Sequence, residues 1–261
     1  MREHHRRAID VLSKKLSGDP TVLALIIGGS VAKGYAREAS DVDCYIVVPD
    51  DQFSERLSAR DTHYMDRDVC DYEGGYVDGK YISLDWMKKC AKVGNEPTRW
   101  SFCDAEVEFS RADNLQDLID EIARYPKDEK EERIRKLTIQ FHVHAWFTRE
   151  AVQREDRYFL SYSANNLVLF GGRMILVLNE MLYPCPKWFM HELANAPRKP
   201  DGFMKSIDAA LDSPSKETLT HLAELVLGFA HWPDISRKWP AEFMLANEWS
   251  WMFGGVHASE M

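Results

Sequence analysis

The chain has 261 residues, of which 45% are hydrophobic and 29% charged, and its formal net charge is −9. This composition leaves no case for overall disorder, and the length allows two globular domains of ordinary size. The negative balance argues against a protein that holds duplex nucleic acid mainly through clustered Lys and Arg. It suits a cationic small-molecule partner, although many proteins are acidic for solubility alone.

The cysteines and the N-terminal residues indicate the compartment. The five cysteines are scattered and never form a C-x-x-C pair, as is typical of reduced thiols. The charged residues 1–7 are followed by an amphipathic stretch, so we expect no signal peptide. No apolar run approaches the ~18 residues that a membrane span needs. We therefore expect a cytoplasmic protein with no membrane partner.

In the first half of the chain, short apolar strands alternate with helices. Periodic apolar residues predict a helix over 4–17, and uncharged β-branched residues predict a buried strand over 21–27. The segments expected after these are two helical turns within 31–37, a strand over 42–48, a helix over 51–60, extended segments around 69–72 and 75–82, a helix from 83 to 93, and an alternating strand over 105–109. Together they indicate one small mixed sheet.

The second half contains helical patterns only. They cover 115–124, 128–154, 158–182, 187–195, 203–211, 216–230 and 240–253, with Pro and Gly between them. We therefore predict an α+β fold, with a small mixed-sheet domain over residues 1–118 and an all-helical domain over 119–261.

Gly28-Gly29-Ser30 follows the first predicted strand and begins a helix. Glycine lets backbone N–H groups approach phosphate oxygens closely, a serine hydroxyl can add a hydrogen bond, and the helix dipole favours negative charge. The same residues would also serve as a simple tight turn, so this motif alone is weak evidence for a phosphate site.

Asp41 and Asp43 begin the second predicted apolar strand. Residues two apart in a strand lie on one face, so both carboxylates should point the same way. Two neighbouring carboxylates repel each other unless a cation lies between them, and Mg²⁺ is a hard ion that carboxylates and phosphates hold. The alternative is a pair of solvated acids at a sheet edge. The pair together with the glycine turn favours a metal and phosphate site.

The segment from Ile26 to Val48 resembles the signature of nucleotidyltransferases of the DNA polymerase beta superfamily: an apolar residue, Gly-Gly or Gly-Ser, a spacer, and Asp-apolar-Asp on the next strand. The resemblance implies that Gly28, Gly29 and Ser30 bind phosphates of a nucleoside triphosphate. It also implies that Asp41 and Asp43 are catalytic and hold Mg²⁺ at the α-phosphate.

The same family has a third carboxylate on a later strand, and two locations are open. Asp78 lies among extended residues that lead into a helix, where similar small-molecule nucleotidyltransferases place it, and we favour it as the third metal ligand and general base. Glu106 and Glu108 on the alternating strand are the alternative, although both read more simply as exposed strand residues.

Residues 179–188 contain Asn-Glu-x-x-Tyr-Pro-x-x-Lys-Trp. This stretch resembles the helical substrate domain of bacterial aminoglycoside-type nucleotidyltransferases, and the resemblance makes 1–118 the catalytic domain and 119–261 the substrate-binding domain. Lys187 would suit a triphosphate oxygen as a flexible point charge, but it reads equally well as a surface lysine. His142 and His144 face different sides of a helix and are expected to be structural or exposed.

The resemblance implies Mg²⁺-dependent transfer of a nucleoside monophosphate, AMP from ATP, to a hydroxyl of a small molecule such as an aminoglycoside-like compound, with release of pyrophosphate. One alternative is a nucleotide-binding regulatory or antitoxin-like module without turnover, which the aspartate pair disfavours. Another is nucleotidylation of a protein or RNA, and the lack of a basic run disfavours RNA. The acceptor, the nucleotide and the oligomeric state stay open.

Overall fold

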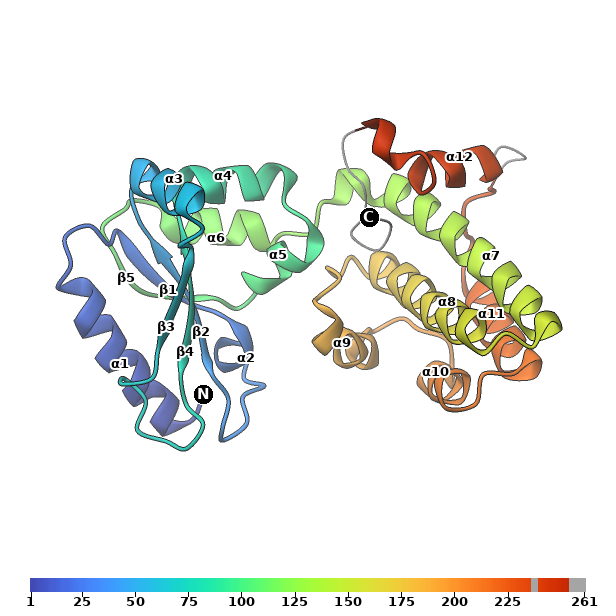
Figure 1. Cartoon of the computed structure of the whole chain (residues 1–261), viewed down its shortest axis with the longest axis horizontal. Coiled ribbons are helices and arrows are strands. Elements are labelled where there is room, and N and C mark those ends of the chain that lie inside the picture. Colours follow the sequence, from blue (N-terminus) through green and yellow to red (C-terminus); the bar gives the residue numbers. More distant parts are fainter. Residues whose placement is uncertain (236–238, 254–261) are drawn as a thin grey trace. The chain divides into compact units, whose positions relative to one another are not determined.

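The computed structural model describes residues 1–235 and 239–253, and the chain divides into two compact units, Met1–Arg124 and Tyr125–Met261 (Figure 1). The predicted division at residue 118 falls inside helix α6 (Leu115–Ala123), whose buried Ile119 and Ile122 pack into the core of the first unit. A helix cannot be divided there without exposing this apolar face.

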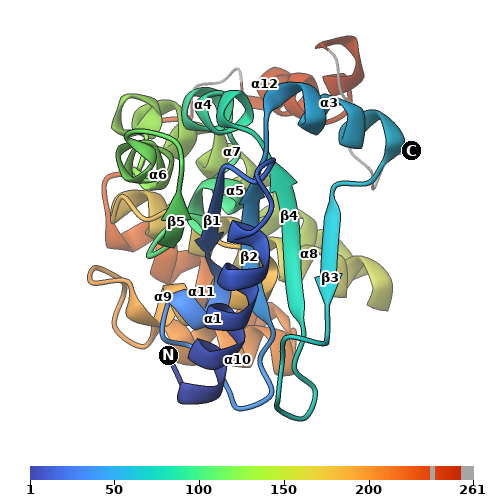
Figure 2. The same cartoon turned by 90° about the vertical axis from the view of Figure 1, so that its left-hand side faces the viewer.

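The first unit is built on a five-stranded sheet with the order β3-β4-β2-β1-β5 (Figure 2). The strands are β1 (Ala24–Ile27), β2 (Val42–Val47), β3 (His63–Asp66), β4 (Val77–Ile82) and β5 (Glu106–Ser110). Strand β1 is antiparallel to β2 and β5, whereas β2 and β4 are parallel. The mixed sheet that the sequence predicts is therefore confirmed.

Six helices accompany this sheet in the first unit: α1 (Glu3–Ser17), α2 (Gly29–Ala32), α3 (Asp50–Ala59), α4 (Leu84–Val93), α5 (Glu96–Ser101) and α6. Because alternate strand residues face opposite sides, Leu25 and Ile27 pack with α1 on one face. Ala24 and Ile26 pack with α4 and α6 on the other face. Figure 2 shows α1 lying across its face of the sheet.

Some predicted elements of this unit are wrong. The expected extended segment at 69–72 is a loop, and the short helix expected within 31–37 is α2, which already begins at Gly29. Strand β3 was not predicted, because it is a polar edge strand with no apolar alternation. Helix α5 was also not predicted. Asn95 follows the predicted helix over 83–93 and caps a new helix, because its side chain accepts a hydrogen bond from Thr98 N at 3.0 Å.

Within the described residues, the second unit contains helices and no strand, so the predicted α+β class is confirmed. Its helices are α7 (Lys130–Arg154), α8 (Arg157–Leu178), α9 (Phe189–Asn195), α10 (Phe203–Asp212), α11 (Lys216–Phe229) and α12 (Trp239–Ala246), with 3₁₀ turns at Lys127–Glu129, Pro186–Trp188 and Ser250–Phe253. The single helix expected over 240–253 is thus interrupted after Ala246.

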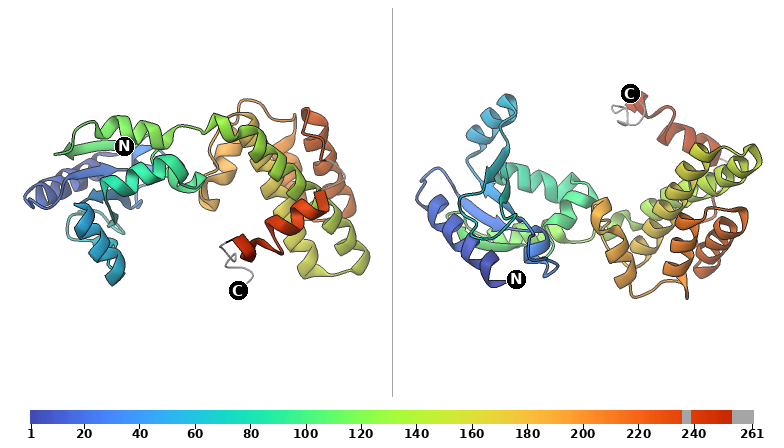
Figure 3. Two further views of the ribbon diagram at one scale, coloured as in Figure 1. Left: turned by 90° about the horizontal axis from the view of Figure 1, so that it is seen from above. Right: turned by 60° about the horizontal axis from the view of Figure 1, so that its bottom comes forward.

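Helices α7 and α8 form an antiparallel pair at the centre of the second unit, and α10 and α11 pack against this pair. Figure 3 shows α12, in red, beside the yellow-green α7. Although α7 and α8 are long, no helix in the described part of the chain combines the length and the apolar character that a membrane span requires.

Candidate active site

The turn after β1 is shaped by a glycine that no other residue can replace without strain. Gly29 has a φ of +62°, in the left-handed region that favours glycine. A Cβ on Gly29 would lie 1.8 Å from Oδ2 and 2.4 Å from Cγ of Asp43. The carboxylate of Asp43 therefore occupies the place where a side chain of residue 29 would be, and it lies directly against the turn.

Strand pairing brings Asp43 to a third carboxylate. In the parallel register of β2 and β4, Asp43 lies opposite Asp78, and Asp41 precedes Asp43 by two residues. One carboxylate oxygen each of Asp41, Asp43 and Asp78 lies within 4.8 Å of the others, and all three residues are half-buried. The three acids singled out in the sequence thus meet at one place.

The alternative carboxylates Glu106 and Glu108 lie on β5, which is separated from β2 by β1. Glu108 accepts hydrogen bonds from both terminal nitrogens of Arg6, at 2.7 and 2.5 Å, and so ties α1 to the sheet. Glu106 is exposed and pairs with Ile27. Neither belongs to the carboxylate group, which among the described residues contains only Asp41, Asp43 and Asp78.

Two residues that the sequence analysis missed contact these acids. Nε2 of His63, on β3, lies at hydrogen-bond distance (2.9 Å) from Oδ1 of Asp78. The hydroxyl of Tyr76 hydrogen-bonds to Asp41, and this bond, followed by the negative charge of Asp41, raises the pKa of Tyr76. His63 belongs to the strand that was not predicted. Tyr76 had a usable signal, because it lies two residues before Asp78 and so on the same side of the chain.

The donor set suits a hard divalent cation because it consists of oxygen atoms. Cys44, between Asp43 and the rest of β2, faces the core beneath α1. Burial raises the pKa of Cys44 to about 12, so its thiol stays protonated at neutral pH and offers no thiolate. Three carboxylates at this separation repel one another, and a cation among them removes that repulsion.

Lys33, at the end of α2, fixes the glycine turn to the segment after α5. Its side chain is only 2% exposed, and Nζ lies 3.8 Å from Oδ2 of Asp104. Nζ also donates a hydrogen bond to the backbone carbonyl of Cys103 and lies 4.3 Å from the ring centroid of Trp100. A buried ammonium with these contacts holds α2 in place.

The remaining candidates of the sequence analysis lie in the second unit. Lys187 is exposed on the Pro186–Trp188 turn, and its Nζ is 5.6 Å from the ring centroid of Trp188. His142 is half-buried. His144 is only 4% exposed and stacks on Phe170, so it is structural and not exposed.

A mixed sheet that carries a glycine turn against three carboxylates is the arrangement of a nucleotidyl-transferring domain, and comparison with known proteins agrees. Residues 5–157 match the family described as nucleotidyltransferase domain, so the chain belongs to that family. The general activity of this family is nucleotidyl transfer, and its substrates are nucleoside triphosphates. The family typically uses a divalent metal.

No curated protein matches the chain. Among solved structures, the chain is similar to one described as a nucleotidyltransferase-like protein from Exiguobacterium sibiricum 255-15. The alignment has 12% identity and a TM-score of 0.45, and it covers 95% of this chain and 78% of the other.

Proposed function

We propose that this protein is a Mg²⁺-dependent nucleotidyltransferase that transfers AMP from ATP to a hydroxyl group of a small molecule, with release of pyrophosphate. An aminoglycoside-like compound is the acceptor class to test first. The observation that supports the proposal is the meeting of Asp41, Asp43 and Asp78 within 4.8 Å, with Asp43 against the turn at Gly29.

Asp41, Asp43 and Asp78 are the residues that would hold Mg²⁺. When bound, the ion would neutralise the triphosphate, acidify the acceptor hydroxyl and stabilise the charge that develops at the α-phosphorus. The backbone of the sheet positions two of these carboxylates, because the pairing of β2 with β4 makes Asp43 and Asp78 direct neighbours. Rigid strands position catalytic groups better than loops do.

The turn Gly28-Gly29-Ser30 would bind the β- and γ-phosphates. Helix α2 has four residues, so its dipole is small, and the binding must come from backbone amides and the Ser30 hydroxyl. The amide of Gly28 already donates to the carbonyl of Asp43 at 3.0 Å, which leaves the amides that follow it for the phosphates. Lys33 keeps these amides in place through its buried contacts.

Asp78 is the residue that we propose as general base for the acceptor hydroxyl. His63 holds Oδ1 of Asp78 at 2.9 Å and so orients the carboxylate, which makes His63 a positioning residue. In this proposal the first unit (Met1–Arg124) carries the catalysis, the second unit (Tyr125–Met261) binds the acceptor, and Lys187 contacts the triphosphate.

The proposal is tested by pyrophosphate release from the full chain with Mg²⁺, each of the four nucleoside triphosphates, and a panel of aminoglycosides and other polyols. Acceptor-dependent release with ATP is expected. It should be lost in Asp43→Asn and kept in Asp85→Asn, because Asp85 is an exposed aspartate on α4 that pairs with Lys88 at 3.0 Å.

Other outcomes separate the alternatives. Tight ATP binding without release for any acceptor would favour the regulatory or antitoxin-like module. Release that requires an added protein or RNA would favour nucleotidylation of a macromolecule. Release that Asp43→Asn leaves unchanged would contradict the assignment of the site itself.

A further inference from the structure

The face of the sheet that carries the three acids continues beyond them along β2, β3 and β4. In the register of these strands, Lys80 of β4 lies opposite Tyr45 of β2 and His63 of β3. Lys80 is also two residues beyond Asp78, which lies opposite Asp43. Residues two apart in a strand point to the same side, and their Cα atoms are about 7 Å apart. The flexible stem of Lys80 can therefore bring its ammonium group beside a ligand that the carboxylates hold.

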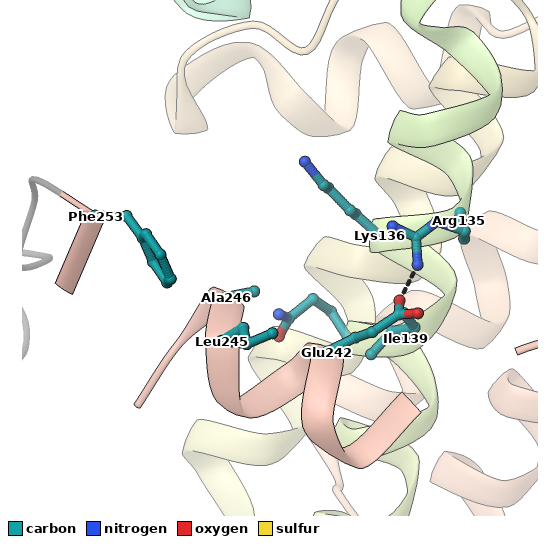
Figure 4. Close-up of a pocket in the computed structure, with 8 residues that line it drawn as sticks. Arg135, Lys136, Ile139, Glu242, Leu245, Ala246 and Phe253 are labelled. Carbon is teal, nitrogen blue, oxygen red and sulfur yellow. Dashed lines mark hydrogen bonds and ion pairs between the residues drawn. The ribbon is translucent and has the colours of Figure 1, made fainter. Parts of the chain in front are cut away.

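Lys80 is exposed, and no acidic side chain neutralises its positive charge. In the described part of the chain its ammonium group forms neither a hydrogen bond nor an ion pair, not even with the three acids on the same face. Arg135 of the second unit is a contrasting cation, because Figure 4 shows it turned toward Glu242, with which it forms an ion pair. The charge of Lys80 is thus available to a ligand.

The ring of Tyr45 shows the direction of the Lys80 side chain. Tyr45 is 7% exposed, its hydroxyl lies 2.5 Å from Oγ of Ser101, and its ring stacks on Phe102 with centroids 4.5 Å apart. Nζ of Lys80 lies 5.8 Å from the centroid of this fixed ring, so the side chain reaches from β4 toward β2. A lysine beside an aromatic ring keeps its charge. The ammonium group therefore lies over the two strands that carry the acids.

The strand order determines the side from which each substrate approaches. The glycine turn follows β1 and lies against Asp43, whereas β4 with Asp78 and the edge strand β3 are on the other side of β2. In the proposed reaction the attacking and leaving oxygens are in line on opposite sides of the α-phosphorus. Pyrophosphate would leave toward the turn and the hydroxyl would enter from the side of Asp78. The α-phosphate would then lie over β2 and β4, next to Lys80.

We propose that Lys80 is a catalytic residue whose ammonium group donates a hydrogen bond to a non-bridging oxygen of the α-phosphate. This inference deepens the proposed function and rests on its placement of the nucleotide. The bond from the acceptor oxygen to the α-phosphorus forms as the bond to pyrophosphate breaks, and the hydroxyl proton passes to Asp78. Lys80 keeps its proton throughout and stabilises the charge that develops at the α-phosphate oxygens.

Nucleotide binding tests this contact without turnover. Isothermal titration calorimetry on the full chain with Mg²⁺ compares AMP with adenosine, which lacks only the phosphate. The unmodified chain should bind AMP at least about tenfold more tightly than adenosine. Lys80→Met should weaken AMP binding about tenfold and leave adenosine binding unchanged. Pyrophosphate, which would bind at the glycine turn, should keep its affinity in Lys80→Met.

A matched control and a kinetic assay assign the effect to Lys80. Lys89 is an exposed lysine of α4 that, among the described residues, also forms no ion pair, and Lys89→Met should change nothing. In the pyrophosphate-release assay Lys80→Met should lower kcat about a hundredfold, because it removes a donor to a developing charge. Lys80→Arg keeps the charge with a different geometry and should restore part of kcat.

Each of four results would overturn the inference: an unmodified chain that binds AMP and adenosine equally, an AMP affinity that Lys80→Met leaves unchanged, a loss in Lys80→Met that affects pyrophosphate alone, or an unchanged kcat. Absence of pyrophosphate release from the unmodified chain with every acceptor would contradict the proposed function, and the comparison of AMP with adenosine would still decide the role of Lys80. Lys80→Gln replaces Lys80→Met if the methionine variant does not fold.

Discussion

Replacing Gly29 by alanine separates backbone strain from the placement of Asp43. The added Cβ would lie 1.8 Å from Oδ2 of Asp43, far inside van der Waals contact, so the carboxylate or the turn must move. Gly34 provides a matched control in the same connection. Its φ of +77° is also left-handed, but a Cβ there would meet no heavy atom within 4 Å.

Both substitutions force alanine into a left-handed conformation, which costs about 1–2 kcal/mol of unfolding free energy. Only Gly29→Ala also displaces Asp43, and a misplacement of about 1 Å in a reacting group costs about a hundredfold in rate. We therefore expect similar losses of stability in urea unfolding for the two variants. Pyrophosphate release should fall about a hundredfold in Gly29→Ala and stay near the unmodified rate in Gly34→Ala.

The comparison refutes the reasoning if the two variants have the same rate of release. Equal rates would mean that Asp43 tolerates displacement, or that the turn adapts without moving it. A loss of folding in Gly29→Ala alone, measured by the unfolding transition, would instead show that the close contact serves stability more than chemistry.

Two further predictions concern the carboxylate site, and a third concerns a buried histidine of the second unit. Asp43→Asn or Asp78→Asn should raise the metal-free unfolding free energy by about 1 kcal/mol, as repulsion is relieved, and should reduce the rise in Tm that Mg²⁺ causes; an unchanged Mg²⁺ effect would contradict this. His63→Ala should lower transfer about tenfold with the Mg²⁺ dependence shifted to higher concentration, and a rate that stays the same would remove its positioning role. Burial lowers the pKa of His144 from 6.5 to about 4, so the unfolded state takes up the proton first as pH falls. Unfolding free energy should therefore drop by about 2 kcal/mol from pH 7.5 to 5, and this part of the slope should be absent in His144→Phe.

The local parts of the site were predictable from sequence because their geometry is set by neighbouring residues. Alternation along β2 places Asp41 and Asp43 on one side of the chain, and the apolar residues around Val42 mark the strand. The glycine turn is likewise a local signal. These two features, with the family resemblance, were sufficient to predict the α+β class that the structure confirms.

The parts that depend on long-range pairing were not determined by sequence. Whether Asp78 or Glu108 lies beside Asp43 depends on strand order, because β4 pairs directly with β2 whereas β5 pairs with β1. The spacing of apolar residues along the sequence carries no information on the order of the strands in the sheet. The polar edge strand that carries His63 gives no apolar pattern, so the contact of His63 with Asp78 had no signal in the sequence.

The glycine turn and the aspartate pair depend on each other, and this explains why neither motif alone is strong evidence for an active site. Asp43 can lie against the turn only because residue 29 has no Cβ, and a left-handed φ at this position is free of strain only for glycine. Three carboxylates held together destabilise the fold in the absence of a cation. A sequence that uses a left-handed glycine to bring mutually repelling acids together therefore gives up stability at the carboxylates, which is the expected trade-off at a site that serves chemistry.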